Sequence, residues 1–261
     1  MGNVKSEAMF AQTRRKLILD MVNRNSFVTV NELCESLNMS PATIRNDLRQ
    51  MHAEGLLERM HGGAISPTKT SYEPDTSQKE VKNVRQKEAI ARRAVSYIHP
   101  GDVIALDSGT TTFMLAKLLG DIEKLTVVTY DLQIAAWLES NTNVSLFMAG
   151  GMMRRKFRCT GGQTTIDTLS KLHVDRAFIA ANGLSVKLGL STPNIDMGSV
   201  KSVLVDFADQ ALLLCDSSKI NHNSFVSFAP MNRIHGLITD SGADPAFVEE
   251  VRSMNITVDI V

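Results

Sequence analysis

A run of hydroxyl side chains around a glycine follows a short apolar segment near the middle of the chain. The run is Asp107-Ser108-Gly109-Thr110-Thr111-Thr112, and the residues from Phe113 onward have a helical pattern. A loop of this kind presents backbone N–H groups, hydroxyls and the positive end of a helix dipole, which together suit a phosphate. The same residues could instead only cap a helix and bind nothing. The pattern therefore indicates a phosphate site, with a plain helix cap as the alternative.

Polar residues and glycines follow several other apolar runs of the same region. Glycines let a ligand approach the backbone, and Lys219 either neutralises an anion or lies solvated at the surface. Arg154 belongs to a basic cluster at 154–158, which is either an anion site or a solvated loop. We expect these residues to line a pocket with the loop at 107–112: Thr129, Tyr130, Asp131, Gly150, Gly151, Arg154, Asn182, Gly183, Asp216 and Lys219.

A second group of residues, nearer the N-terminus, has the chemistry of DNA recognition. Ile44, Leu48 and Met51 fall on one side of a predicted helix, so its other side must face outward. Outward Arg can bind guanine, Asn can bind adenine, and Thr can contact a phosphate or a thymine methyl. A solvated helix face is the alternative. The outward residues, with Arg45 beside them, are Ala42, Thr43, Arg45, Asn46 and Arg49.

Caps and spacing predict the helices that position this face. Apolar residues recur at helical spacing within 10–25, just after basic residues that include Arg14. Thr29 and Glu32 have the spacing of a capping box that starts a second helix. Ser40, followed by a proline, starts the third helix after a tight turn. This is the arrangement of a helix-turn-helix, and we expect Arg14, Thr29 and Ser40 to belong to its DNA-contacting set.

A short wing is predicted after the third helix. Gly55 ends the helix, and residues 56–60 read as a strand that leads into His61-Gly62-Gly63. Arg59 and His61 would then contact phosphates or the minor groove. For His61, a surface histidine on a loop is the alternative.

The chain changes character after residue 65. Residues 66–80 are polar, contain two prolines and read as a linker. A helix is predicted at 84–98, and short apolar runs then alternate with helical patterns. This order implies an open, mainly parallel α/β domain that binds ligands at the carboxyl ends of its strands. We expect a winged helix-turn-helix domain at 1–65, a linker at 66–80 and an effector-binding domain at 81–261, with strands at 103–106, 126–129, 144–148, 177–181, 211–215, 237–239 and 257–260.

Composition sets the class of protein. The chain has 261 residues, 43% of them hydrophobic, and lacks an apolar run long enough for a membrane span or a secretory signal, so we expect a cytoplasmic location and no membrane partner. Its formal charge is zero. The first 93 residues nevertheless carry fifteen Lys and Arg against eleven Asp and Glu, whereas the remainder carries thirteen against seventeen. Three separated cysteines indicate neither a disulfide framework nor a zinc site, and we expect neither a metal nor a cofactor.

The motifs are similar to those of the DeoR family of bacterial transcriptional regulators. The family carries Thr-Ile-Arg-x-Asp-Leu and Arg-x-His-Gly-Gly-Ala, which residues 43–48 and 59–64 match. In the second domain the matching marks include residues 106–111, Gly150-Gly151, Asn182-Gly183, Asn194 with Lys201, and residues 216–219. The resemblance implies a sensor domain similar in fold to ribose-5-phosphate isomerase that binds phosphorylated sugars, with Lys201 in its site. Tyr130, Asp196 and Asn221 depart from the usual family residues, which suggests a different effector.

Two functions of different classes follow. One is a repressor of a carbohydrate-metabolism operon that binds double-stranded operator DNA as a dimer or tetramer and is released by a phosphorylated sugar. The other is a sugar-phosphate isomerase with an appended DNA-binding domain. An isomerase needs a general base, and related enzymes place carboxylates after the strand that ends here at Ala180-Ala181-Asn182-Gly183, where this chain has none. We therefore expect binding without turnover.

Overall fold

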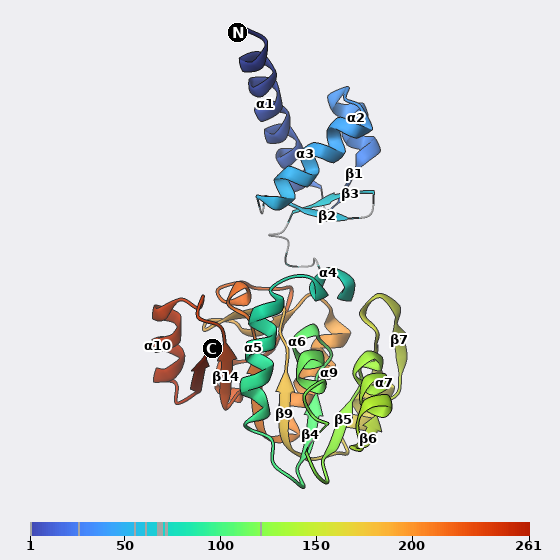
Figure 1. Cartoon of the computed structure of the whole chain (residues 1–261), viewed down its shortest axis with the longest axis vertical. Helices are drawn as coiled ribbons and strands as arrows, with labels where there is room; N and C mark the ends of the chain where they lie inside the picture. The colour runs from blue at the N-terminus through green and yellow to red at the C-terminus, as the bar shows by residue number, and fades with distance from the viewer. Residues whose placement is uncertain are drawn as a thin grey trace. The chain divides into compact units, whose positions relative to one another are not determined.

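The computed structural model describes residues 2–25, 27–54, 56–60, 62–66, 70, 73–120 and 122–261, with side chains from residue 11 onward. The chain divides into two compact units, residues 1–72 and 73–261 (Figure 1). In the described part of the chain, no helix combines the length and the apolar character that a membrane crossing requires. The three cysteines are unpaired, with Cys159 and Cys215 buried.

The first unit contains the predicted helices. A capping box at Thr29 starts the second helix, Asn38 adopts a left-handed conformation in the following turn, and the Ser40 side chain caps the third helix through the Thr43 N–H. Their apolar faces meet in one core, which includes Ile18, Leu33, Ile44, Leu48 and Met51. The helices are α1 (Gly2–Arg24), α2 (Val30–Leu37) and α3 (Pro41–Ala53).

A three-stranded antiparallel sheet completes the first unit. Its strands are β1 (Val28–Thr29), β2 (Glu58–Met60) and β3 (Gly63–Ile65), in the order β1-β3-β2. Gly62 adopts a φ of +83°, and a Cβ on Gly63 would lie 2.2 Å from the Val28 carbonyl oxygen. Glycines are therefore needed for both the reversal and the close pairing of this wing.

The second unit is built on a seven-stranded parallel sheet in the order β15-β14-β12-β9-β4-β5-β6. Each of the seven predicted strands is one of its members, so the α/β class is confirmed. Because all strands run in one direction, their carboxyl ends lie along one edge. The strands are β4 (Val103–Leu106), β5 (Thr126–Thr129), β6 (Ser145–Met148), β9 (Val174–Ile179), β12 (Ala208–Leu214), β14 (Gly236–Thr239) and β15 (Thr257–Ile260).

Helices cover both faces of this sheet. On one face Ile104 and Leu106 pack with α5 (Val84–Val95), α6 (Thr110–Ala116) and α7 (Leu132–Asn141). On the other face Ala105 and Ala177 pack with α8 (Gln163–Leu169), α9 (Ile195–Asp206) and α10 (Pro245–Ser253). Figure 1 shows α5 and α6 in front of β9 and β4. The near-continuous apolar strands of the sequence are explained by this burial on both sides.

Three small features were not predicted. Helix α4 (Thr76–Glu80) forms within the segment that the sequence indicates as a linker. Strands β7 (Met152–Arg154) and β8 (Cys159–Gly161) form a hairpin, and β10 (Gly183–Ser185), β11 (Gly189–Thr192) and β13 (Val226–Ala229) form a separate antiparallel sheet. Their strands have at most four residues, which is too short for a clear apolar period.

Candidate functional site

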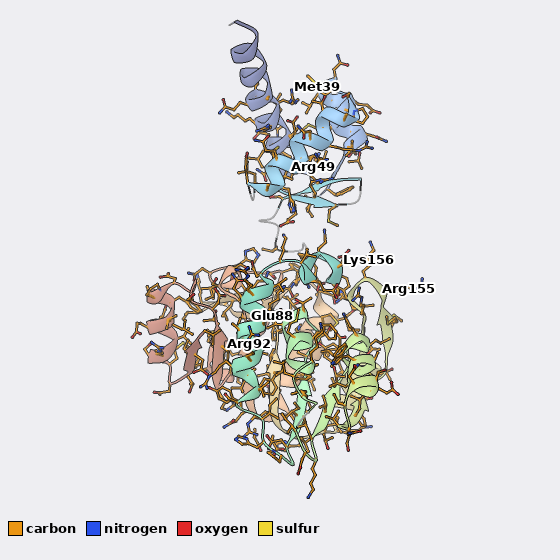
Figure 2. The ribbon with its side chains drawn as sticks, viewed as in Figure 1. Met39, Arg49, Glu88, Arg92, Arg155 and Lys156 are labelled. Carbon is orange, nitrogen blue, oxygen red and sulfur yellow. The ribbon has the colours of Figure 1, made fainter. Side chains whose placement is uncertain are left out.

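Helix α3 presents the polar face that the sequence predicts. Ile44, Leu48 and Met51 are buried, whereas Ala42, Arg45, Asn46 and Arg49 are exposed and Thr43 is half-buried. Among the described residues, the Arg45 guanidinium has no hydrogen-bond or ion-pair partner. Figure 2 shows Arg49 on the same helix. An exposed helix face with the free donors of Arg45 fits the base edges and phosphates of a DNA groove.

Asp47 lies on the buried side of the same helix, which the sequence analysis did not predict. Its side chain is 3% exposed and accepts hydrogen bonds from Arg14 Nε at 2.5 Å and Arg14 Nη2 at 3.1 Å. Arg15 Nε lies 3.3 Å from the same carboxylate. Hydrogen bonding to Asp47 raises the pKa of Arg14. Asp47 thereby joins α1 to α3, and Arg14, which was predicted to contact DNA, has this carboxylate as its partner.

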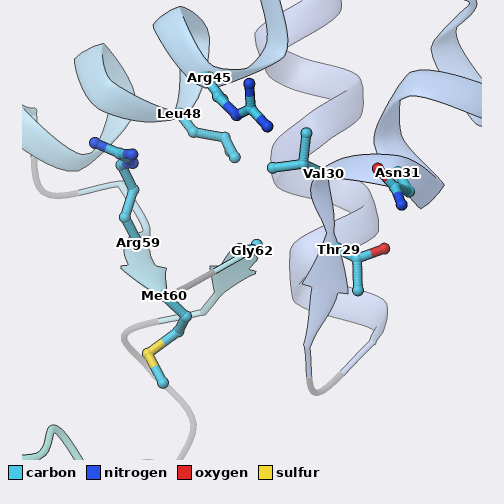
Figure 3. A pocket seen from close by; sticks show the side chains of 9 residues that line it. Thr29, Val30, Asn31, Arg45, Leu48, Arg59, Met60 and Gly62 are labelled. Carbon is cyan, nitrogen blue, oxygen red and sulfur yellow. The ribbon is translucent and has the colours of Figure 1, made fainter. Parts of the chain in front are cut away.

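A groove of about 470 Å³ opens beside α3 (Figure 3). Arg45 and Arg59 contribute positive charge to it, from α3 and from the wing respectively. Its other lining residues are Thr29, Val30, Asn31, Leu48, Met60, Gly62 and Gly63. Because two guanidinium groups line one concave surface, the groove is suited to a phosphate of a nucleic acid backbone.

Two further residues predicted to contact DNA have capping roles. The Thr29 hydroxyl accepts from the Glu32 N–H at 3.1 Å, and the Ser40 hydroxyl accepts from the Thr43 N–H at 3.2 Å. These bonds fix the ends of α2 and α3 and so orient the exposed face. His61 lies outside the described residues.

The centre of the second site is Asp107, at the carboxyl end of β4. It is fully buried and accepts hydrogen bonds from the Lys201 ammonium and the Tyr130 hydroxyl. It also accepts from the Ala180 N–H at 2.7 Å and from the Ser108 N–H at 2.9 Å. Asp107 therefore connects the ends of three adjacent strands with α9, which carries Lys201.

Tyr130 and Asp131 continue this network at the end of β5. Burial and the neighbouring Asp107 charge raise the pKa of Tyr130 well above its usual value, so its hydroxyl stays protonated and donates to Asp107. Asp131 accepts from the Ser108 hydroxyl at 2.7 Å and caps α7 through the Gln133 and Ile134 N–H groups. Burial raises the pKa of Asp131. Both carboxylates near the predicted pocket thus have structural partners, and neither is free to act as the base of an isomerase.

The hydroxyls of the loop at 107–112 divide into two groups. Ser108 and Thr112 donate to other atoms of the site, Thr112 to the Asp107 and Gly109 carbonyls. Thr110 and Thr111 are each 7% exposed, and within the described chain their hydroxyls have no hydrogen-bond partner. Neither hydroxyl is among the buried polar atoms that lack a partner in the described chain, so both keep contact with solvent and are accessible to a ligand.

Other predicted residues are explained by packing. Thr129 donates to the Leu106 carbonyl at 2.9 Å, and the Asn182 side chain accepts from Thr192 at 3.2 Å. Added Cβ atoms would lie 2.1 Å from Thr165 Oγ1 at Gly151 and 2.4 Å from the His222 carbonyl oxygen at Gly183. Gly150 has open space at that position. Asp216 accepts from Asn83 Nδ2 at 2.9 Å.

Basic side chains gather at this edge of the sheet. Lys79 lies close enough to Lys201 and Lys219 for their charges to lower its pKa, although burial is the larger cause. Lys219 is half-buried, and no described residue forms a hydrogen bond or an ion pair with its ammonium. Arg154 reaches the same region, because its guanidinium and the Lys79 ammonium both pair with the Glu73 carboxylate, at 3.0 and 3.3 Å. Lys79 was not predicted as a site residue, because it lies in the polar segment that the sequence indicates as a linker.

The buried Lys87 side chain should make the free energy of unfolding depend on pH. Burial lowers its pKa from 10.5 to about 8, and its ammonium donates to the Lys79 and Lys82 carbonyls at 2.5 Å each. Between pH 8 and 10.5 the unfolded chain therefore binds more protons at this position, so its contribution to the free energy of unfolding rises with pH. Lys87→Met should flatten this rise in urea unfolding followed by Trp137 fluorescence. Lys171→Met, a control at an exposed lysine, should show the same rise as the native protein. If Lys87→Met showed that rise as well, the assignment to Lys87 would be contradicted.

Comparisons with known proteins match each of the two units to a known domain family. A model described as DeoR-like helix-turn-helix domain matches residues 14–70, and one described as DeoR C terminal sensor domain matches residues 82–241. The uncharacterized HTH-type transcriptional regulator YulB of Bacillus subtilis is 35% identical over 97% of this chain and 98% of its own length. The putative aga operon transcriptional repressor of Escherichia coli O157:H7 is 31% identical over 95% of this chain and 93% of its own length. A solved ribose 5-phosphate isomerase A of Methanocaldococcus jannaschii has 18% identity and a TM-score of 0.40 over 53% of this chain and 55% of its own.

A helix-turn-helix with an exposed basic face, followed by an α/β sensor unit, defines the class of DNA-binding transcriptional regulators. The chain belongs to the DeoR family of these regulators. It is a regulator and not an enzyme, which decides between the two functions that the sequence analysis weighed.

Proposed function

We propose that the chain represses an operon of carbohydrate metabolism and is released from its operator by a phosphorylated sugar. The observation that carries this proposal is that the half-buried Lys219 ammonium, at the carboxyl edge of the sheet near Lys79, has no hydrogen-bond or ion-pair partner among the described residues. The hydroxyls of Thr110 and Thr111, which have no hydrogen-bond partner among the described residues, lie in the first turn of the adjacent helix α6. A phosphate monoester, with its charge of about −2 and strong acceptor oxygens, supplies what both groups need. The name of the aga operon relative supports repression.

Each of the two units has its own function in this proposal. We assign DNA binding to residues 1–65 and effector binding to residues 81–261, and the two family matches support this division. Residues 66–80 connect the two, and their second part, 73–80, packs with the sensor unit. We assign DNA contact to the exposed α3 residues and to Arg59, and effector contact to the loop at 107–112 with Arg154 and Lys219. Lys201 and Tyr130 hold Asp107 and position that loop.

The regulator acts as a dimer or tetramer in this proposal. One winged helix covers too few base pairs to specify a genomic site, so repeated half-sites and several copies are required. An effector then weakens DNA binding through a coupling free energy of about 1–3 kcal/mol per site. The coupling is reciprocal: the effector lowers the affinity for DNA by the same factor by which DNA lowers the affinity for the effector.

A thermal-shift screen with phosphorylated sugars tests the effector assignment. A ligand at about 100 times its Kd adds about 2.7 kcal/mol to the free energy of unfolding, which gives a measurable rise in Tm. Thr110→Ala and Lys219→Ala should reduce the shift while operator binding in a gel-shift titration stays unchanged. Lys171→Ala, which removes the same charge before β9 at the opposite edge of the sheet, should leave both measurements unchanged. A full shift in the Thr110 and Lys219 variants, or a loss of operator binding in a folded variant, would contradict the assignment.

A further inference from the structure

A short segment at the start of the second unit lies over the predicted effector site. We call residues 73–80, which comprise Glu73 and helix α4, the strap. Helix α4 packs beside α6, which opens at the loop 107–112. It contains no buried residue. Polar contacts, and not a hydrophobic core, therefore hold the strap in place.

Ion pairs anchor both ends of the strap to the β7–β8 hairpin. At its start, Glu73 Oε2 accepts from Arg154 Nη2 at 3.0 Å, and Glu73 Oε1 lies 3.3 Å from Lys79 Nζ. At its end, Glu80 Oε1 accepts from Arg158 Nη1 at 2.8 Å. The Arg154 guanidinium also lies 4.1 Å from the centre of the Phe157 ring. Figure 2 shows Arg155 and Lys156, which lie between these contacts in the hairpin.

The Glu73 carboxylate, at the start of the strap, forms ion pairs with two cations. Among the described residues, Lys79 and Arg154 form ion pairs with Glu73 alone. Its side chain is 13% exposed, so the contact is largely shielded from water. The neighbouring Lys219 forms no ion pair with any described residue, whereas Lys201 pairs with Asp107. The surplus at Lys79, Arg154 and Lys219 is the charge that a dianionic phosphate would neutralise.

We propose that Glu73 is a built-in competitor of the effector: its carboxylate holds Arg154 and Lys79 in the free protein, and the effector phosphate replaces it there. This inference rests on the proposed function, since it uses the same anion site. A phosphate beside Lys219 attracts Lys79 and Arg154 and repels the Glu73 carboxylate. Loss of the Glu73 contacts frees the start of the strap, which follows directly on the first unit in sequence. Effector binding thereby changes the segment that joins the sensor unit to the DNA-binding unit.

The test uses the full chain, with inorganic phosphate as the probe. Glu73→Gln keeps the shape of the side chain and removes the competing charge. Phosphate affinity, measured by thermal shift and Trp137 fluorescence, should rise about tenfold, because a charged hydrogen bond no longer has to be broken. Glu88→Gln is the matched control, since Glu88 pairs with Arg92 on the exposed side of α5 (Figure 2). Its phosphate affinity should equal that of the native protein.

Hydrogen exchange of the strap gives a second readout. Amides 76–80 should exchange faster in the native protein when phosphate is bound, and should already exchange fast in the Glu73→Gln variant without phosphate. Unchanged or weaker phosphate affinity in Glu73→Gln, together with a normal response in the native protein, overturns this inference and leaves the effector assignment intact. No response to phosphate or phosphorylated sugars in either protein overturns both.

Discussion

Replacing Asp107 with Ala is expected to lower the free energy of unfolding of the sensor unit by about 3–5 kcal/mol. Asp107 is fully buried, and its removal leaves the buried Lys201 ammonium without its carboxylate and the Tyr130 hydroxyl without its acceptor. The cost is large because a charge in the interior has neither water nor a counter-ion. Urea denaturation followed by the fluorescence of Trp137, the single tryptophan of the chain, measures it directly.

Two further variants separate the charge from the shape. Asp107→Asn keeps the volume and should cost less than Ala, because the amide oxygen still accepts a hydrogen bond. Adding Lys201→Met to Asp107→Asn should recover part of the loss, since the unpaired ammonium is then gone. If Asp107→Ala unfolded within about 1 kcal/mol of the native protein, the network around Asp107 would not be the structural centre of the site.

Replacing Arg45 with Ala is expected to weaken operator binding by about 1–3 kcal/mol for each half-site, or roughly 10- to 100-fold. Arg45 is exposed on α3 and lines the groove that also holds Arg59. Operator fragments are first selected from genomic DNA with the native protein, and affinities are then measured by gel shift. The salt dependence identifies the contact: loss of a phosphate contact reduces the slope of log K against log salt by about 1, whereas loss of a base contact relaxes the sequence preference.

Arg92→Ala supplies the matched control for Arg45. It removes an equal charge from the exposed side of α5 in the sensor unit, where Arg92 pairs with Glu88 one helical turn away. Operator affinity should therefore stay unchanged. Equal affinities of the native protein and Arg45→Ala would mean that α3 is not the recognition helix.

Local signals in the sequence predicted a large part of the fold. The capping box at Thr29 and the cap at Ser40 are both present, and the seven predicted strands form one parallel sheet. Caps depend on residues three positions apart, and buried parallel strands read as apolar runs, so short windows of sequence contain both signals. Asp47 could also have been placed, because it follows Ile44 by three residues and precedes Leu48 and Met51 on the same face.

The site itself was predicted less completely. The loop at 107–112 was found because its hydroxyls and glycine are consecutive in the sequence. Lys79 and Glu73 were assigned to a linker, since a polar segment with two prolines gives no sign of what it packs against. Tyr130 was expected to line the pocket, and it lies fully buried beneath Asp107. The direction of a side chain at a strand end depends on neighbouring elements that are distant in the sequence.

The sequence by itself determined the class of this protein: a helix-turn-helix whose exposed face suits DNA, joined to a parallel α/β unit with an anion loop. These properties depend on residue types and on spacings of a few positions. Only the tertiary structure decided the charge balance of the sensor site, because it joins Asp107 to Lys201 and Glu73 to Arg154 across 94 and 81 positions respectively. Pairs this far apart are brought together by strand order and packing, and no local pattern specifies which carboxylate neutralises which cation.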